Sequence, residues 1–80
     1  MRILVKNKLN SFEAYFIINI FYDEYIKKSK KEIVEGLIFY DGQDYFAIPN
    51  VTKSECDEIC KSLMINGYYD LTNFECFEQL

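Results

Sequence analysis

Cys56 and Cys60 are the residues whose type and spacing most directly raise a question of chemistry. They stand four positions apart, so on a helix they would share a face, and together with Cys76 they could offer three thiolates to zinc. Zinc sites usually combine CxxC spacing with a fourth Cys or His, and this chain has neither. Both cysteines also fall on an apolar helical stripe, where cysteine packs as a small hydrophobic side chain. We therefore predict packed thiols and no metal.

Other catalytic groups are scarce. The chain contains no histidine, which is the commonest general base and nucleophile activator, and it has no GxSxG, GxGxxG or Walker A pattern. Asp41 and Asp44 bracket a predicted hairpin loop, but this loop lacks the number of ligands that a calcium site needs. Aspartate at such positions is typical of turns. The sequence predicts that the protein is not an enzyme and binds no cofactor.

The densest charge run is Lys27-Lys28-Ser29-Lys30-Lys31, with Tyr25 beside it. Lysines can contact phosphates and a tyrosine can stack on a base, but such a run also suits a solvated loop that keeps a hairpin soluble. Residues 1–31 carry seven basic and three acidic side chains, whereas residues 32–80 carry two basic and ten acidic ones. Because the acidic part would repel a nucleic-acid backbone, direct nucleic-acid binding is not expected.

A helix over residues 53–66 is the clearest structural element. Thr52-Lys53-Ser54-Glu55 is a capping box preceded by apolar Val51, and Gly67 ends the pattern in the manner of a helix C-terminus. The residues expected on the buried face recur at helical spacing: Cys56, Ile59, Cys60, Leu63 and Met64.

Short strands are predicted at residues 2–6, 33–40, 45–48 and 68–72. A two-residue turn in the central hairpin would set Phe39 against Asp44 and mix its faces. A four-residue loop instead sets Tyr40 against Tyr45 and places Phe39 and Phe46 on one face, so we predict the longer loop. Residues 73–80 give no clear pattern.

Residues 12–26 allow two interpretations. The run from Tyr15 to Tyr22 is rich in β-branched and aromatic residues, which favours a strand at about 14–23 with Ala14, Phe16, Ile18, Ile20 and Tyr22 on one face. The alternative is a helix at about 11–28. We prefer the strand interpretation, which gives an α+β fold in which helix 53–66 packs on one face of a small antiparallel sheet. The second gives a ferredoxin-like β-α-β-β-α-β order.

The size and composition predict a single domain over residues 1–80. Half of the residues are hydrophobic and 18% are aromatic, which is ample for one core. A chain this short buries only about 60% of its unfolded surface, so some apolar side chains are left for a partner. No signal-peptide pattern and no apolar stretch of membrane-spanning length is seen, and the odd number of cysteines suggests a reducing compartment. We expect a cytoplasmic protein that does not enter a membrane.

The aromatic surplus points to an interface. If the Phe39 face of the hairpin packs on the helix, then Ile38, Tyr40, Tyr45 and Ala47 face away from it. Tyrosines beside apolar residues are typical of protein interfaces because they bury a large area at low entropic cost. The competing interpretation is that a second helix formed by residues 12–26 covers this face.

In size, acidity, abundance of Tyr and Phe and lack of catalytic groups, the chain resembles small phage-encoded inhibitors, including anti-CRISPR proteins. The resemblance is one of composition over the whole chain. It implies a non-enzymatic protein-binding module that occludes a basic surface of a nucleic-acid-handling enzyme. The carboxylates expected to meet that surface are Asp41, Asp44, Asp57, Glu58 and Asp70, with Tyr40 and Tyr45 as further contacts.

The alternative function is a homo-oligomeric structural or regulatory protein, such as a homodimer, that buries its spare aromatic face against itself.

Overall fold

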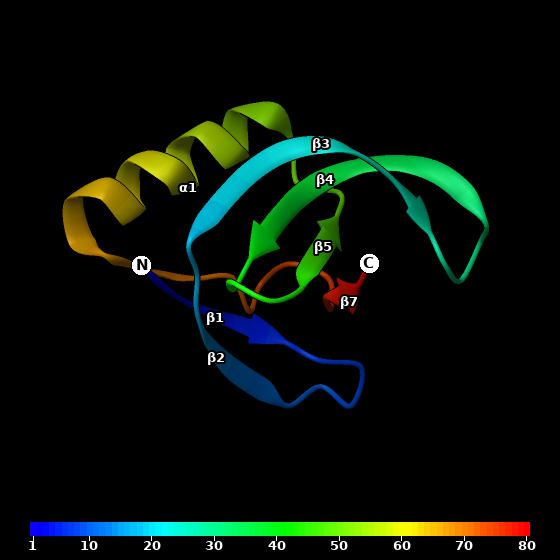
Figure 1. Cartoon of the computed structure of the whole chain (residues 1–80), viewed down its shortest axis with the longest axis horizontal. Helices are drawn as coiled ribbons and strands as arrows, with labels where there is room; N and C mark the ends of the chain where they lie inside the picture. Colours follow the sequence, from blue (N-terminus) through cyan, green and yellow to red (C-terminus); the bar gives the residue numbers. More distant parts are fainter.

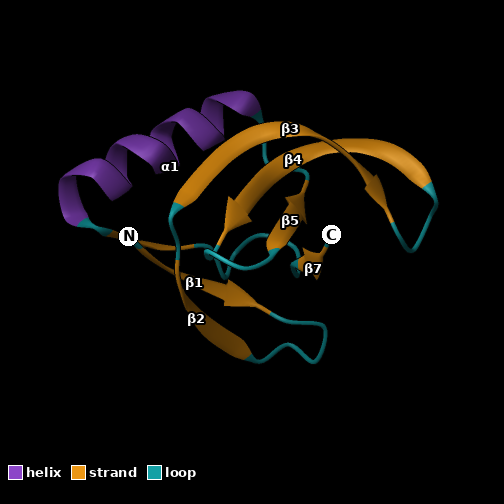
Figure 2. Cartoon of the chain, in the orientation of Figure 1, coloured by secondary structure: helices purple, strands orange, loops and turns teal.

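The computed structural model describes residues 1–80 and shows an α+β fold with two sheets and one helix (Figures 1 and 2). The elements follow one another as β1 (Arg2–Lys6), β2 (Phe12–Phe16), β3 (Asn19–Lys27), β4 (Glu32–Tyr40), β5 (Tyr45–Pro49), α1 (Lys53–Asn66), β6 (Tyr68–Asp70) and β7 (Glu78–Gln79). The α+β class and the helix 53–66 are therefore confirmed, and no helix is long and apolar enough to cross a membrane.

The strands form two small sheets. One has the order β2-β1-β6 and the other β3-β4-β5-β7. All pairs are antiparallel except β1 with β6, which is parallel. Figure 1 shows β3 and β4 arching over the centre of the molecule, with α1 beside β3 and the β1–β2 hairpin on the opposite side. The single sheet that the sequence predicted is thus replaced by two.

Helix α1 begins and ends as its sequence indicates. Thr52 accepts a hydrogen bond from the Glu55 amide at 3.1 Å, and the Glu55 carboxylate accepts one from the Thr52 amide at 3.0 Å. Gly67 takes the left-handed conformation, with φ 70°, and donates its N–H to the Leu63 carbonyl. The prediction that Met64 is buried was wrong, because its side chain is 84% exposed. The buried face of α1 is narrower than predicted and consists of Cys56, Ile59 and Leu63.

Residues 12–27 are extended, so the helix at about 11–28 and the ferredoxin-like order are wrong. The predicted strand 14–23 is divided at residues 17–18, where the chain passes from one sheet to the other. This bend shifts the alternation by one position. Tyr15 and Ile17 point inward before it and Ile20 after it, whereas Phe16 and Ile18, predicted to share the face of Ile20, are exposed.

The β4–β5 hairpin has the predicted register. Tyr40 faces Tyr45 and Phe39 faces Phe46 across a four-residue loop. The expected inner face is buried in the main core, together with residues from both sheets and from α1: Ile3, Val5, Ile17, Ile20, Leu37, Phe39, Phe46, Ile48, Val51, Cys56, Ile59, Leu63 and Leu71. This core lies between the two sheets and under the helix.

The opposite face of the hairpin is partly covered, against expectation. Ile38 and Ala47 form a second buried cluster with Tyr25 of β3, and Phe21 and Val34 pack against it. Strand β7 pairs with the edge of β5 and sets Glu78 beside Ala47. The predicted strand 68–72 is present in shorter form as β6, whereas β7 was not foreseen.

Candidate functional site

The loop between β4 and β5, with the tyrosine at each of its ends, is the part of the predicted site that the fold brings together. We call residues 40–45 the tyrosine turn. The Asp41 carboxylate accepts hydrogen bonds from the amides of Gln43 at 2.9 Å and Asp44 at 2.8 Å, and these lower the pKa of Asp41. Gly42 supplies the positive φ of 99° that closes the loop. The turn is therefore held by hydrogen bonds between its own backbone amides and the Asp41 carboxylate, which remains negatively charged at neutral pH.

Two stacked rings stand at the base of this turn. The ring centroids of Tyr40 and Tyr45 are 4.5 Å apart with an interplanar angle of 25°, and Phe21 approaches Tyr45 edge-on at 6.5 Å. Tyr45 remains 48% exposed and Tyr40 is half-buried. Stacking restricts both side chains before any partner arrives, so little rotamer freedom would be lost on binding.

Apolar side chains that the sequence did not single out surround the tyrosine turn. Ile18 is 66% exposed, and its amide donates to the Tyr40 carbonyl at 2.8 Å. Leu80 is 42% exposed, and its amide donates to the Tyr45 carbonyl at 2.9 Å. Ile18 was missed because it lies at the bend between two strands. Leu80 was missed because no pattern in residues 73–80 connects them to β5.

The remaining predicted acidic residues lie elsewhere. Asp57 and Glu58 are exposed on α1, and Asp70 ends β6. The Asp70 carboxylate accepts from the Thr72 hydroxyl at 2.6 Å and from the Thr72 amide at 2.9 Å, and these bonds lower its pKa. The structure therefore groups Tyr40, Asp41, Asp44 and Tyr45 on one turn and leaves the other three carboxylates on two separate elements.

A second exposed apolar feature lies on the outer face of β2. Phe12 is 61% exposed, Phe16 is 77% exposed and Ala14 stands exposed between them; we call these three residues the phenylalanine strip. Across the sheet Lys6 faces Phe12 and Arg2 faces Phe16. The predicted strand at about 14–23 left out Phe12 and set Ala14 and Phe16 on the same face as Ile20, so the strip was not identified.

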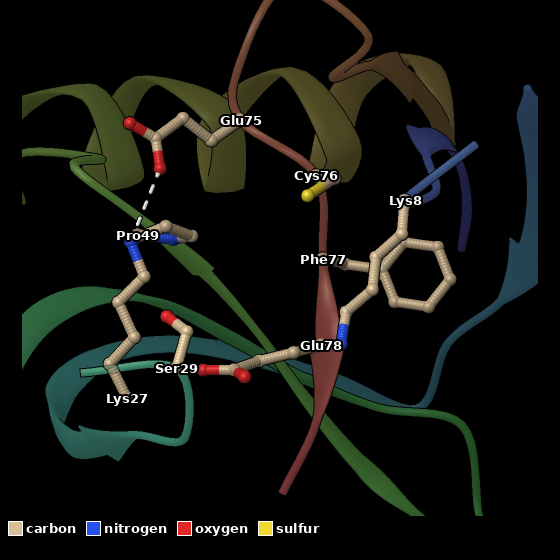
Figure 3. Close-up of a pocket in the computed structure, with 8 residues that line it drawn as sticks. All are labelled: Lys8, Lys27, Ser29, Pro49, Glu75, Cys76, Phe77 and Glu78. Atoms are coloured by element: carbon tan, nitrogen blue, oxygen red, sulfur yellow. Dashed lines mark ion pairs between the residues drawn. The ribbon is translucent and has the colours of Figure 1, made fainter. Parts of the chain in front are cut away.

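A cavity of about 420 Å³ opens between the β3–β4 arm and the C-terminal residues (Figure 3). Its lining carries charges of both signs, and Lys27 and Glu75 form an ion pair at 3.7 Å across it. The Cys76 thiol and the Ser29 hydroxyl also line it, but the chain has no imidazole to activate either of them. The exposed lysines 28, 30 and 31 lie in and beside the arm's tip.

The three cysteines are free thiols in different surroundings. Cys56 is buried in the core, and burial, reinforced by neighbouring Cys60, raises the pKa of its thiol to about 12. Cys60 is half-buried, with its sulfur 4.0 Å from the Ile20 carbonyl. Cys76 lines the cavity instead. No group of three His, Cys, Asp or Glu side chains lies close enough together to hold a metal.

No family model, curated protein or solved structure matches this chain. The function must therefore be argued from the tyrosine turn and the exposed apolar surface themselves.

Proposed function

We propose that this protein is a non-enzymatic protein-binding module whose tyrosine turn docks on a basic protein surface. The observation that carries the proposal is the stacked pair of Tyr40 and Tyr45, half exposed and flanked by two carboxylates. Aromatic side chains with an apolar surround and a polar rim are typical of the centres of protein interfaces.

The apolar part of the turn would supply most of the affinity. Ile18 and Leu80 extend the exposed surface on either side of the tyrosine pair, and their backbone hydrogen bonds fix them to the ends of β4 and β5. A partner that covers Tyr45 would remove a rigid aromatic ring from water, and such anchors are the residues whose truncation weakens interfaces most.

The charges of the turn would act on the rate of association. Asp41 keeps its negative charge because two amides donate to it, and Asp44 lies two residues beyond Gly42. Residues 32–80 carry ten acidic and two basic side chains, so the long-range field of this part of the chain attracts a positive surface. We therefore expect association to slow as salt rises, since exposed charges are screened beyond about 8 Å at physiological ionic strength.

The specific form of this proposal is an inhibitor, of phage or mobile-element origin, that occludes the basic surface of a nucleic-acid-handling enzyme inside the cytoplasm. It rests on the compositional resemblance to anti-CRISPR proteins. The tyrosine turn supplies two carboxylates where such an enzyme would hold phosphates. It requires that the partner's nucleic acid and this protein compete for one surface.

The test is capture of a partner from the native cell on immobilised wild-type protein, followed by kinetic measurement with the purified partner. Tyr45→Ala should raise the off-rate by an amount equivalent to about 1 kcal/mol or more of binding free energy. Asp44→Lys should lower the on-rate and weaken its salt dependence.

Tyr68→Ala is the matched control, because it truncates a tyrosine that is 38% exposed on β6, away from the turn. This variant should bind as the wild-type protein does. The proposal would be abandoned if the partner bound Tyr45→Ala and Asp44→Lys at the same rates as wild-type protein at every salt concentration.

A second candidate function, a homo-oligomeric structural or regulatory protein, is favoured by a different observation. Phe12 and Phe16 are the most exposed aromatic side chains of the molecule, and nothing in the single chain covers them. Light scattering tests this second candidate, because a stable dimer supports self-association, whereas the tyrosine turn is tested by the partner's binding to Tyr45→Ala.

A further inference from the structure

Strand β2 forms a free edge of its sheet, and its unpaired backbone N–H and C=O groups belong to Phe12, Ala14 and Phe16. The amide of Ile17 donates to Met1 and that of Asn7 to Ser11, so the odd-numbered positions of β2 face β1. In an antiparallel pair, alternate residues direct their N–H and C=O groups away from the partner strand. Phe12, Ala14 and Phe16 therefore present theirs to the open edge.

The other side of the sheet supports this assignment. On β1 the alternate residues that face away from β2 bond to β6: the Arg2 amide donates to Gly67 and the Leu4 carbonyl accepts from Leu71. The outward backbone groups of β2 have no neighbouring strand to bond to, because β2 is the outermost strand of the sheet (Figure 1). The free backbone groups and the exposed phenyl rings thus lie on the same three residues.

We propose that β2 pairs with β2 of a second copy of this chain, antiparallel and centred on Ala14, to form a homodimer with one continuous six-stranded sheet. The order Phe12, Ala14, Phe16 reads the same in both directions, so a two-fold axis at Ala14 sets Phe12 of each copy opposite Phe16 of the other. Each of these facing pairs can then exchange N–H···O=C bonds, since all three residues point theirs outward.

The side chains on the outer face fit this register. Phe12 and Phe16 of opposite copies become cross-strand neighbours, a pairing that stabilises antiparallel sheets. Ala14 at the axis is small enough to stand opposite itself. On β1, Lys6 is the neighbour of Phe12 and Arg2 is the neighbour of Phe16. Across the dimer, each row of facing residues therefore holds one cation, two phenyl rings and a second cation. No two like charges face one another at the axis.

Charge complementarity selects a second copy as the occupant. The register brings the positive loop of residues 7–11, which carries Lys8, beside the bend at residues 17–18 of the other copy. Asp41 lies close to this bend, because Ile18 bonds to Tyr40 and the Asp41 charge acts on the Tyr15 hydroxyl. A basic loop thus meets an acidic turn at both ends of the pair, which follows from the opposite charges of residues 1–31 and 32–80.

The edge lacks three of the devices that prevent such pairing, namely proline, an outward lysine and a bulge. Exposed edge strands are usually protected by proline, by an outward lysine or by a bulge, and the outward positions of β2 carry two phenylalanines and an alanine. The one charged residue, Glu13, is an inward-pointing charge of the kind that can also protect an edge, but its carboxylate is engaged within the chain, where it accepts a hydrogen bond from the Asn7 side chain at 2.9 Å.

The test is the solution mass of the purified protein, measured by light scattering and sedimentation over a wide concentration range. Wild-type protein should have the mass of a dimer. Ala14→Lys should have the mass of a monomer, because it sets two like charges directly opposite at the axis. Mixing Ala14→Lys with Ala14→Glu should restore a dimer that contains one chain of each, since the introduced charges then attract.

Ala14→Pro is a second disrupting variant, because it removes an N–H that has no partner within the chain and proline is tolerated on edge strands. Ile33→Lys is the matched control: Ile33 is 70% exposed but lies on the inner strand β4, so the dimer should persist. Circular dichroism verifies that every variant is folded.

A monomeric wild-type protein would overturn the proposal. So would a dimer that survives both Ala14→Lys and Ala14→Pro, or a mixture that forms no mixed dimer. If a wild-type monomer instead captures another protein through β2, the free edge accepts a strand from that partner and not from a second copy. These outcomes are independent of Tyr45→Ala, so failure of the dimer and failure of the tyrosine turn can be told apart.

Discussion

At the scale of single residues, Tyr25 and Glu78 stand out because each carries a buried polar atom without a hydrogen-bond partner. Tyr25 is only 7% exposed, and burial, with the nearby charge of Glu78, raises the pKa of its hydroxyl to about 12. An unpaired buried hydroxyl costs roughly 1–3 kcal/mol of stability. The ring of Tyr25, by contrast, packs usefully on Ile38 and Ala47.

We therefore expect Tyr25→Phe to leave the free energy of unfolding unchanged or to raise it by up to about 1 kcal/mol, since it removes the hydroxyl and keeps the ring. Urea denaturation of both proteins measures this. Tyr22→Phe is the control, because the Tyr22 hydroxyl does have a partner, the Glu35 carboxylate. A large loss of stability in Tyr25→Phe would show that its hydroxyl is satisfied after all.

Two hydrogen-bonded carboxylates, Asp41 and Asp70, link stability to acid pH. Hydrogen bonds from Asp44 and Gln43 lower the pKa of Asp41, and Thr72 lowers that of Asp70. A group whose pKa is lower in the folded state stabilises the fold above its unfolded value, 3.8 here. This contribution is lost as the pH falls from 3.8 through the still lower folded values.

Replacing both side chains by alanine should therefore reduce the acid sensitivity of the protein below about pH 4. Thermal unfolding at a series of pH values gives the comparison. Parallel pH profiles for wild-type and double-variant protein would mean that these turns do not couple to protonation.

At the scale of elements, the start of α1 is stabilised by a reciprocal capping box between Thr52 and Glu55. Thr52 is exposed, so its side chain contributes through the cap and not through packing. The helix covers part of the core with Cys56, Ile59 and Leu63, and fraying of its first turn would first loosen Cys56.

Thr52→Ala should lower the free energy of unfolding by about 0.5–2 kcal/mol, whereas Thr52→Ser should lower it far less because serine also caps well. Chemical denaturation monitored by circular dichroism measures both. Equal stability of the alanine and serine variants would show that the cap contributes nothing.

The β3–β4 arm, also at the scale of elements, is buried at one end and exposed at the other. Its first half packs on the core, whereas Ile26 and Ile33 near its tip are 63% and 70% exposed. Lysines 27–31 fill the tip, where they protect these exposed apolar residues from association with other chains. Lys28, Lys30 and Lys31 are exposed in this loop, whereas Lys27 pairs with Glu75.

At the scale of the whole molecule, the C-terminal segment contacts both sheets: the Phe77 amide donates to the Lys6 carbonyl of β1, and β7 pairs with β5. Phe74 and Phe77 pack against the main core, and the Phe77 ring lies 5.5 Å from that of Tyr15. Glu75 bonds to Asn50 and pairs with Lys27, while β7 extends the second sheet. Residues 73–80 therefore close the open side of a core that is otherwise bounded by two sheets and one helix.

Deleting residues 73–80 should leave the protein largely unfolded. Fully burying two phenylalanines contributes about 3–6 kcal/mol, so the loss of these two partly buried rings together with the β7 pairing removes a large part of the 5–15 kcal/mol typical of a small domain. Near-ultraviolet circular dichroism and the cooperativity of urea unfolding report the loss. Deletion of Leu80 alone is the control, and wild-type unfolding of the longer deletion would contradict this role of the segment.

The sequence by itself determined the elements whose signals are local. The capping box and Gly67 bound α1, and the four-residue loop fixed the Tyr40–Tyr45 register, because caps and turns depend on neighbouring backbone groups alone. For the same reason it correctly placed Tyr40, Asp41, Asp44 and Tyr45 on one turn.

Only the tertiary structure decided which apolar side chains are buried and which elements cover them. The bend at residues 17–18 exposes Phe16, and Tyr25 of β3 packs with Ala47 of β5 in a buried cluster. Both depend on pairings between strands far apart in the chain, and alternation within a strand cannot specify them, since a shift of one residue reverses every face. The free edge of β2 is likewise a property of strand order, which no local pattern of residues records.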